Sequence, residues 1–313
     1  MNITAPQDIK VALIMGGRSD EREVSLNSGS QAYEALIQKG FQVKTFDPID
    51  HQMLRDLIAY DADVAFIALH GKYGEDGVIQ GALEEIGLPY TGSGVRASAL
   101  AMDKFRSKIL YKHVGLQTPK SILIERGDSY SCSNISSQLG EKVVVKPTSD
   151  GSALGVSIVH EISQLNEALE KALEVGSRAL IESYIPGTEI TIGVLGNENV
   201  EALPIIEIVP HAEFYNYEAK YEQGGSDHII PARLDEAVYQ KAQDIAIRAH
   251  KILGCRGMSR SDLIVDEENE IWILETNTIP GMTQTSLLPD AARHAGYSFE
   301  ELCAYLIELA LEQ

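Results

Sequence analysis

The sequence predicts an α/β protein, in part α+β, that begins with a parallel sheet. Over the first hundred residues, short β-rich apolar runs alternate with helical patterns, which is the order typical of a parallel sheet with helices on both faces. Farther along, strands follow one another directly and favour a mixed α+β arrangement. The 313 residues suffice for two or three compact domains.

Composition excludes several classes of protein. The chain has 26 Lys and Arg against 46 Asp and Glu, a formal net charge of −20, whereas a general nucleic-acid binder needs a cationic surface. The three cysteines have no paired spacing, so we expect neither a disulfide framework nor a zinc site. Neither a signal peptide nor an apolar run near the roughly 20 residues of a membrane helix is present, so we expect a cytoplasmic protein without a membrane partner.

The first unit contains the predicted parallel sheet. Its expected strands are residues 9–15, 41–46 and 64–69, and its expected helices are 24–39, 53–59 and 77–86. The loops at 16–23 and 70–77 follow the carboxyl ends of strands. Because parallel sheets bind ligands at that edge, both loops are candidates for a site.

The rest of the chain predicts smaller sheets and a long loop. The expected elements are helices at 95–102, 103–113, 163–175 and 235–253, and strands at 121–124, 142–146, 156–159, 179–183, 189–195, 200–204, 258–265 and 271–277. Ser298 and Glu301 have the spacing of a capping box and predict a final helix. Residues 211–231 form a long polar loop, which we interpret as a lid.

A loop of small residues follows a predicted strand at Lys146. Residues 147–155 are rich in Ser and Gly, so backbone amides can approach an anion while the lysine adds a point charge. The pattern suits phosphate, although a simple glycine hairpin explains this segment equally well. The Gly-x-Gly pattern at 92–97 lies after several strands, and we interpret it as a turn into a helix rather than a dinucleotide site.

Four polar residues near the C-terminus predict a ligand-binding hairpin. Arg260 and Asp262 are two apart on one expected strand, and Glu275 and Asn277 are two apart on the next. Strand side chains alternate, so each pair points to one face. Two carboxylates and an amide oxygen form a ligand set suited to Mg²⁺ held together with phosphates.

The register of this hairpin follows from the expected position of its turn. A turn centred on Glu267-Glu268 places Arg260 opposite Glu275 and Asp262 opposite Ile273, with the polar groups on one face. A surface ladder of salt bridges is the alternative, and the hairpin alone does not decide between them.

Other polar residues are ambiguous when taken singly. His70 ends a buried-looking strand and could be a structural histidine. Glu21 to Glu23 could complement a helix dipole. The aromatic residues of 215–221 could form an exposed packing patch.

Together and in this order, the motifs resemble those of the D-alanine–D-alanine ligase family of the ATP-grasp superfamily. The residues that carry the resemblance are Gly16-Gly17 with 19–25, His70-Gly71 with 74–77, then 90–94, 102–104, Lys146-Pro147 with 151–152, 217–221, 260–262 and 275–283. The resemblance implies three domains, an N-terminal substrate domain (1–101), a central ATP-grasp domain (102–184) and a C-terminal catalytic domain (185–313), with ATP between the last two.

The resemblance also implies a reaction. Two D-alanines are joined at the expense of ATP through an acylphosphate and a tetrahedral intermediate, which supplies a peptidoglycan precursor. The expected ions are two Mg²⁺, which Mn²⁺ could replace, and the expected assembly is a homodimer. The alternatives are a related ligase that uses D-lactate or D-serine as acceptor, and a nucleotide-binding regulatory protein without activity.

By the same resemblance, individual residues receive roles toward ATP. The phosphates are expected near the lysines Lys104, Lys146 and Lys220. Adenine and ribose are expected near Glu182 and Glu189. The metal is expected on the hairpin residues Asp262, Glu275 and Asn277.

The residues expected around D-alanine also follow from the resemblance. Glu21 holds the first ammonium group with His70 nearby, Ser286 and Leu287 receive the second carboxylate, and Arg260 with Gly281 stabilises the developing oxyanion. Ser152 and Tyr221 hydrogen-bond with Glu21 when the lid closes. Two positions depart from the family pattern, Ala153 where a second Ser is common and Ser183 where Lys is frequent, whereas Tyr221 matches the dipeptide-forming members.

Overall fold

The N-terminal sheet confirms the predicted parallel arrangement. In the computed structural model, which describes residues 5–149, 154–210 and 226–312, this sheet has the order β2-β1-β3 with parallel pairs. Its elements are η1 (Pro6–Asp8), β1 (Lys10–Ile14), α1 (Arg22–Gln38), β2 (Gln42–Phe46), α2 (Met53–Tyr60), β3 (Val64–Ile67) and α3 (Val78–Glu85). Central strand β1 is almost wholly apolar and buried, so it forms the middle of the first core.

The second sheet is antiparallel, with the order β4-β7-β5-β6. The elements from this part of the chain are α4 (Val95–Met102), α5 (Lys104–His113), β4 (Ser121–Glu125), α6 (Cys132–Leu139), β5 (Val143–Pro147), β6 (Ser157–Val159), η2 (Ile162–Gln164), α7 (Leu165–Val175) and β7 (Arg178–Ser183). Helix α6 is not among the predicted elements. It begins where the Ser131 side chain accepts the backbone N–H of Asn134, which supplies the cap that its polar sequence needs.

The third sheet has the order β11-β10-β8-β12-β13, with β9 beside β8. Its part of the chain contains β8 (Thr188–Gly196), β9 (Glu201–Ala202), β10 (Ile206–Pro210), β11 (Ser226–Ile229), α9 (Glu236–Leu253), β12 (Gly257–Val265), β13 (Ile271–Asn277), α10 (Leu287–His294) and α11 (Phe299–Leu311). The capping box that starts α11 is confirmed.

Two predictions for this sheet were wrong. The strand expected at 200–204 is only the short β9, and the main strand here is β10. The expected lid loop, 211–231, includes β11, which pairs antiparallel with β10. The second error arises because β11 lies in a polar stretch and is stabilised by pairing with β10 rather than by its own pattern. Residues 211–225 lie outside the described part of the chain.

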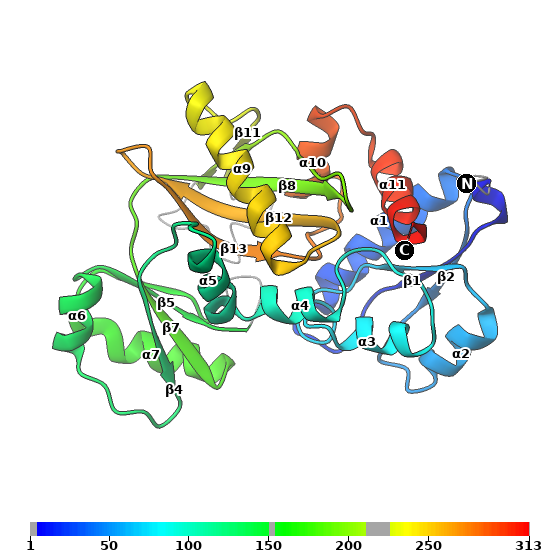
Figure 1. Ribbon diagram of the computed structural model, residues 1–313. Coiled ribbons are helices and arrows are strands. Elements are labelled where there is room, and N and C mark those ends of the chain that lie inside the picture. The colour runs from blue at the N-terminus through cyan, green and yellow to red at the C-terminus, as the bar shows by residue number, and fades with distance from the viewer. Residues whose placement is uncertain (1–4, 150–153, 211–225, 313) are drawn as a thin grey trace.

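Helices from distant parts of the chain complete the cores. Helices α4 and α5 pack against the third sheet, where Tyr111 and Ile273 share one core. Helix α11 packs against α1 and β3, where Leu306 shares a core with Leu36 of α1, and α10 packs against β8 and α11. Figure 1 shows α1 and α11 side by side, with the second sheet at the opposite end of the molecule.

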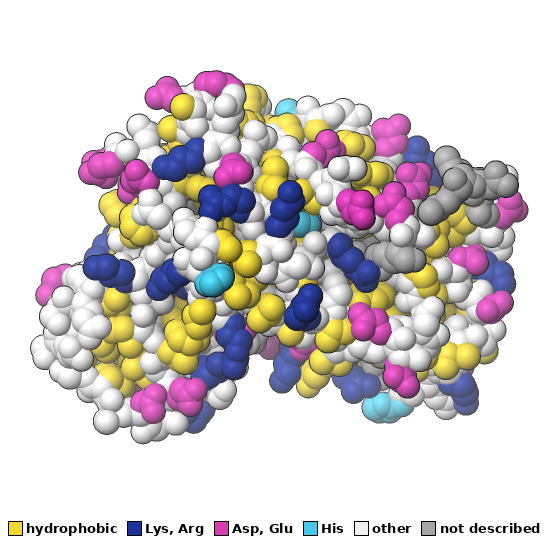
Figure 2. All heavy atoms as spheres, viewed as in Figure 1, with side chains coloured by type: hydrophobic (Ala, Val, Ile, Leu, Met, Phe, Trp, Pro, Cys, Tyr) yellow, Lys and Arg dark blue, Asp and Glu magenta, His cyan; other side chains and the backbone are white. Residues whose placement is uncertain are grey.

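The surface in this orientation is mixed in charge. Figure 2 shows acidic side chains along the upper part of the face and basic ones nearer its middle, with apolar side chains among them. None of the helices in the described ranges combines the length and the apolarity that crossing a bilayer requires.

Candidate active site

The β12–β13 hairpin places the predicted polar residues on one face, but its register differs from the expected one. Arg260 pairs with Asn277, and Asp262 pairs with Glu275. The predicted partners, Glu275 for Arg260 and Ile273 for Asp262, were therefore wrong. Since both carboxylates and the arginine still project from directly paired positions, the prediction of a shared face holds.

Two local features explain the register. The turn is organised by Asp266, whose carboxylate accepts the backbone N–H groups of Glu268 and Glu270, so that Val265 pairs with Ile271. A bulge between Asp262 and Leu263 then adds a further shift of one residue. A register shift of one residue would move the side chains of one strand to the opposite face of the sheet. Two such shifts in the same direction return them to the expected face.

Arg260 and Asp262 form a bidentate ion pair. Nε and Nη2 of Arg260 each lie 2.9 Å from a different carboxylate oxygen of Asp262. The hydroxyl of Thr191 on β8 donates to Oδ1 of Asp262 at 2.6 Å. Both charged side chains are nearly buried, with 13% and 10% of their surfaces exposed. The guanidinium plane is thereby held in a defined orientation, which a single contact would not ensure.

Two lysines, one on α5 and one on β5, approach the same region. Nζ of Lys104, at the start of α5, lies 3.3 Å from Oε2 of Glu275. The backbone N–H of Lys104 donates to the carbonyl of Thr148, just after β5. Lys146 on β5 is buried, which disfavours its charge, but Glu182, Glu275 and Asp262 outweigh burial and raise its pKa. Lys146 is therefore a cation within reach of the hairpin carboxylates.

Glu182 is bound by two lysines. Its Oε2 lies 2.7 Å from Nζ of Lys146, and its Oε1 lies 2.5 Å from Nζ of Lys108 on α5. Burial alone would raise the pKa of Glu182, but the two ammonium groups lower it, so the carboxylate is ionised. Lys108 was missed in the sequence analysis. The signal that could have found it is its position one helical turn after Lys104.

The loop after β13 is braced by its own side chains. Oδ1 of Asn277 accepts the backbone N–H of Ile279 at 2.9 Å. The Ser286 hydroxyl accepts the N–H of Thr283 at 3.2 Å and lies 2.7 Å from the Thr283 hydroxyl. A Cβ atom at Gly281 would lie 2.9 Å from Oγ of Ser286, so the close approach favours glycine. Leu287, the first residue of α10, is buried.

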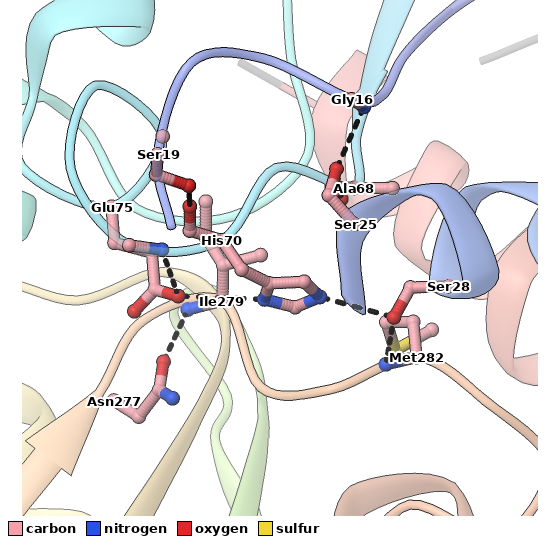
Figure 3. Close-up of polar contacts among 12 residues, drawn as sticks. Gly16, Ser19, Ser25, Ser28, Ala68, His70, Glu75, Asn277, Ile279 and Met282 are labelled. Atoms are coloured by element: carbon pink, nitrogen blue, oxygen red, sulfur yellow. Dashed lines mark hydrogen bonds and ion pairs between the residues drawn. The ribbon is translucent and has the colours of Figure 1, made fainter. Parts of the chain in front are cut away.

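His70 connects the N-terminal sheet to this loop. Its Nε2 lies 3.0 Å from the hydroxyl of Ser28 on α1, and that hydroxyl also accepts the backbone N–H of Met282 at 3.4 Å. On the other side of the ring, Nδ1 lies 3.4 Å from Oε1 of Glu75. Figure 3 shows the imidazole between Glu75 and Ser28, beside the loop that carries Ile279 and Met282.

Glu21 lies in the loop that precedes α1 and is buried. It packs against Gly71, where an added Cβ would be 2.2 Å from Oε2 of Glu21. The φ of Gly71 is +68°, so both space and backbone conformation require glycine here. The hydroxyl of Ser19 donates to the His70 carbonyl at 2.7 Å. The two loops expected at the carboxyl edge of the parallel sheet therefore meet.

The remaining predicted residues lie at the border of this site or beyond the described ranges. Glu189 is the second residue of β8 and pairs with Ile264 of β12. Ser152, Ala153, Lys220 and Tyr221 are outside the described part of the chain, and so is most of the expected lid.

The donor chemistry of the hairpin fits a hard divalent cation. Asp262 and Glu275 face each other directly across the strands, and carboxylate and amide oxygens suit Mg²⁺. In the described ranges, no group of three or more His, Cys, Asp and Glu is arranged to hold a metal. The expected ligand set is different in kind, because it consists of two carboxylates, Asp262 and Glu275, and the side-chain amide of Asn277.

Comparisons with known proteins agree over almost the whole chain. Residues 50–93 match the family described as D-ala D-ala ligase N-terminus, and residues 110–308 match the D-ala D-ala ligase C-terminus. A D-alanine–D-alanine ligase of Syntrophobacter fumaroxidans is 50% identical over 98% of this chain and 99% of its own length. One from Pelotomaculum thermopropionicum is 48% identical over 97% of each chain.

Solved structures show the same likeness. The D-alanine–D-alanine ligase of Bacillus anthracis complexed with ATP is 34% identical, with a TM-score of 0.85 over 97% of this chain and 98% of that one. The VanG D-Ala:D-Ser ligase of Enterococcus faecalis is 31% identical, with a TM-score of 0.83 over 96% of this chain and 99% of that one.

Proposed function

The chain belongs to the D-alanine–D-alanine ligase family, and we propose from this premise which of its residues perform each part of the reaction. The protein is an ATP-dependent, ADP-forming ligase that joins two D-alanine molecules for peptidoglycan biosynthesis. The observation that carries the assignment of residues is the convergence of Lys104 and Lys146 on the Arg260–Asp262–Glu275 face of the β12–β13 hairpin.

The reaction makes two electrostatic demands. A carboxylate oxygen of the first D-alanine attacks the γ-phosphorus of ATP, the bond to the ADP oxygen breaks, and an acylphosphate forms. The neutral amine of the second D-alanine then attacks the acyl carbon, and the tetrahedral intermediate expels phosphate while the nitrogen loses a proton. Charge on the phosphates must be neutralised first, and charge on the carbonyl oxygen second.

The phosphates are assigned to the lysines. Lys104 and Lys146 supply positive charge from α5 and β5, and the family membership adds Lys220, which lies outside the described ranges. Glu182 and Glu189 lie toward the nucleoside. Asp262, Glu275 and Asn277 would hold Mg²⁺, or Mn²⁺ in its place, as two ions that neutralise phosphate charge when bound.

D-Alanine is assigned to the junction of the N-terminal and third sheets. Glu21 binds the first ammonium group beside His70, whose ring is fixed by Ser28 and Glu75. Arg260 and the backbone of Gly281 stabilise the oxyanion, and Arg260 is suited to this because Asp262 holds its plane. The second carboxylate is received by Ser286 and Leu287, at the start of α10. The roles proposed for Ser152 and Tyr221, hydrogen bonds with Glu21, rest on the family membership, since both residues lie outside the described ranges.

The proposed organisation has three parts, at 1–101, 102–184 and 185–313, and the three sheets support it because the strands of each sheet fall within one part. The proposed compartment is the cytoplasm, where ATP is available. The proposed assembly is a homodimer. An exposed apolar cluster around α2 and the start of α3 supports a partner surface; its members are Ile49, Leu54, Ile58, Tyr73 and Val78.

Activity is tested by phosphate release from ATP. Purified protein with Mg²⁺ should release phosphate only when D-alanine is added, and L-alanine serves as the control substrate. Adding D-lactate or D-serine beside D-alanine distinguishes the alternative acceptors, which the similarity to a D-Ala:D-Ser ligase makes worth measuring. Absence of D-alanine-dependent phosphate would overturn the function, and a stronger response to D-lactate or D-serine would reassign the acceptor.

The dimer is tested by sedimentation. The wild-type protein should sediment as a dimer and the Ile58→Glu variant as a monomer, because a charge in the apolar cluster opposes its burial. A monomeric wild-type protein would exclude the proposed assembly, and a dimeric variant would exclude this surface.

A further inference from the structure

One face of helix α5 contacts two sheets at once. Lys104, Lys108 and Tyr111 are spaced four and three residues apart, so their side chains lie along the same side of the helix. Lys104 reaches Glu275 on β13, and Tyr111 donates from Oη to the Thr276 hydroxyl of the same strand at 2.8 Å. Lys108 instead reaches Glu182 on β7. This face of α5 therefore links the β12–β13 hairpin with the second sheet.

Lys108 is buried to an extent that is rare for lysine. Its side chain is 1% exposed, and its Nζ contacts Glu182 and the hydroxyl of Thr118, both at 2.5 Å. Burial lowers the pKa of Lys108 to about 8, although Glu182 opposes the change. Taking an ion pair out of water gives little or no net stability compared with an apolar pair of similar size. Stability alone is therefore a weak reason for a lysine at this position.

The carboxylate of Glu182 divides its two oxygens between two lysines. Oε1 faces Lys108 and Oε2 faces Lys146. Without Lys108, both oxygens would be available to Lys146, and the carboxylate could rotate toward it. The geometry of the Lys146 ammonium group thus depends on a residue that lies on another element.

The charges of Lys108, Lys146 and Glu182 also indicate that Lys146 depends on Lys108. Two ammonium groups share one carboxylate, so Lys108, Lys146 and Glu182 together carry a net positive charge. Burial opposes the charge of Lys146, but Glu182, and after it Glu275 and Asp262 on the hairpin, raise its pKa. With Lys108 removed, Glu182 would neutralise Lys146 completely, and the electrostatic attraction between Lys146 and a polyanion would fall.

We propose that Lys108 is a positioning residue for ATP, which holds the Glu182 carboxylate so that Lys146 keeps its orientation and its charge toward the phosphates. The proposal rests on the proposed function, because it assigns Lys146 to the nucleotide. Lys108 itself touches no substrate in this arrangement and acts through Glu182.

The test compares Lys108→Met with Lys112→Met in the full-length enzyme. Lys112 is an exposed lysine of the same helix and has no assigned role, so it is the matched control. Lys108→Met should raise KM for ATP about tenfold, the usual scale for losing a residue that orients a ligand-binding group. KM for D-alanine should change less than twofold, and Lys112→Met should resemble the wild type.

A double variant distinguishes positioning from simple loss of packing. The reference for it is the Glu182→Gln single variant, which measures the loss of the nucleoside contact proposed for this carboxylate. Because Lys108 acts through Glu182, adding Lys108→Met to Glu182→Gln should raise KM for ATP by less than a further twofold. A role confined to stability predicts additive losses instead. Because the double variant has no carboxylate left between the lysine positions, it also remains informative if the single variant folds poorly.

The outcomes separate the two proposals. A wild-type enzyme without D-alanine-dependent phosphate release would refute the proposed function. An active wild type with equal KM values for ATP in Lys108→Met and Lys112→Met would refute the positioning role. Equal increases in the KM values for ATP and D-alanine, with additive losses in the double variant, would also refute it.

Discussion

The two faces of the β12–β13 hairpin differ in charge, although they are formed by adjacent residues. One face carries Arg260, Asp262 and Glu275, which are charged and border the site. The other carries Ser261 and Thr276, which lie directly opposite each other and are buried. Since strand side chains alternate, the same two strands supply both sets. The charged face is available for ligands, and the neutral face belongs to the core.

The hydroxyl groups of the neutral face have partners within the core. The hydroxyls of Ser261 and Thr276 lie 2.8 Å apart, and Tyr111 donates to Thr276 at 2.8 Å. Ser259 lies 2.7 Å from Nδ1 of His250 on α9, a helix that crosses this side of the sheet (Figure 1). Burial lowers the pKa of His250 to about 4 and raises the pKa of Tyr111, so both groups are neutral near pH 7.

The comparison teaches where this enzyme tolerates charge. Buried charges require a partner, whereas buried hydroxyls require only a hydrogen bond. Charges next to the proposed ATP site are kept in ion pairs, and the layer beneath the hairpin uses neutral groups that fix its register. Changes on the charged face should therefore affect catalysis, and changes on the neutral face should affect stability.

Arg260→Ala should have the largest effect. Loss of an oxyanion donor lowers kcat by about 10² to 10³, and Asp262 also loses its bidentate partner. Turnover is measured by phosphate release and ATP affinity by nucleotide titration, which should change little. Arg260→Lys keeps the charge but not the planar fork, so its rate should be intermediate. Unfolding of the alanine variant, or an unchanged rate, would contradict the assignment.

His250→Gln should change how stability depends on pH. As pH falls through 6.5, the unfolded state takes up a proton that native His250 accepts only near pH 4. The native state therefore loses stability over this window, by about 2 kcal/mol between pH 7 and pH 5. Urea unfolding at both pH values measures the loss, which should be smaller by that amount in the variant.

The control for this prediction is His113→Gln. His113 is an exposed histidine at the end of α5, so the variant should keep the wild-type difference between pH 7 and pH 5. The same pH dependence in wild type and His250→Gln would show that His250 is not the group that takes up the proton.

The division of the hairpin into two faces could be predicted from the sequence, but its register could not. Alternation is local, so the spacing of Arg260 with Asp262 and of Glu275 with Asn277 was sufficient. The register depends on a bulge at Asp262 and on side-chain bonds from Asp266. Neither has a clear sequence signal, because both arise from how the strands meet.

Contacts between segments that are distant in the sequence also could not be predicted. Strand β11 exists through its pairing with β10, and nothing in its own residues indicates this. Lys108 could be placed on a helix face, but its partner Glu182 comes from another sheet. By contrast, the loops after β1 and β3 could be assigned to the site, since parallel sheets bind ligands at that edge.

Glu275→Gln should raise the Mg²⁺ requirement. Replacing one of two hairpin carboxylates with an amide weakens a hard-cation site, and we expect the concentration for half-maximal activity to rise about tenfold, or about 1.4 kcal/mol. Activity is titrated with Mg²⁺ at fixed ATP. Glu267→Gln, in the exposed turn of the same hairpin, is the control. An unchanged titration curve for Glu275→Gln would remove this carboxylate from the metal site.

Tyr111→Phe should have the smallest effect, and only on stability. The variant loses the hydrogen bond to Thr276 while Ser261 still bonds to that hydroxyl, so the free energy of unfolding should fall by about 1 kcal/mol. Tyr130→Phe removes an exposed bond to Asn166 and should change stability less. Urea midpoints measure both, and kcat should stay within twofold of the wild type. A large fall in kcat for Tyr111→Phe would show that the neutral face also controls catalysis, because the hydroxyl layer would then be setting the positions of Glu275 and Arg260 across the strands.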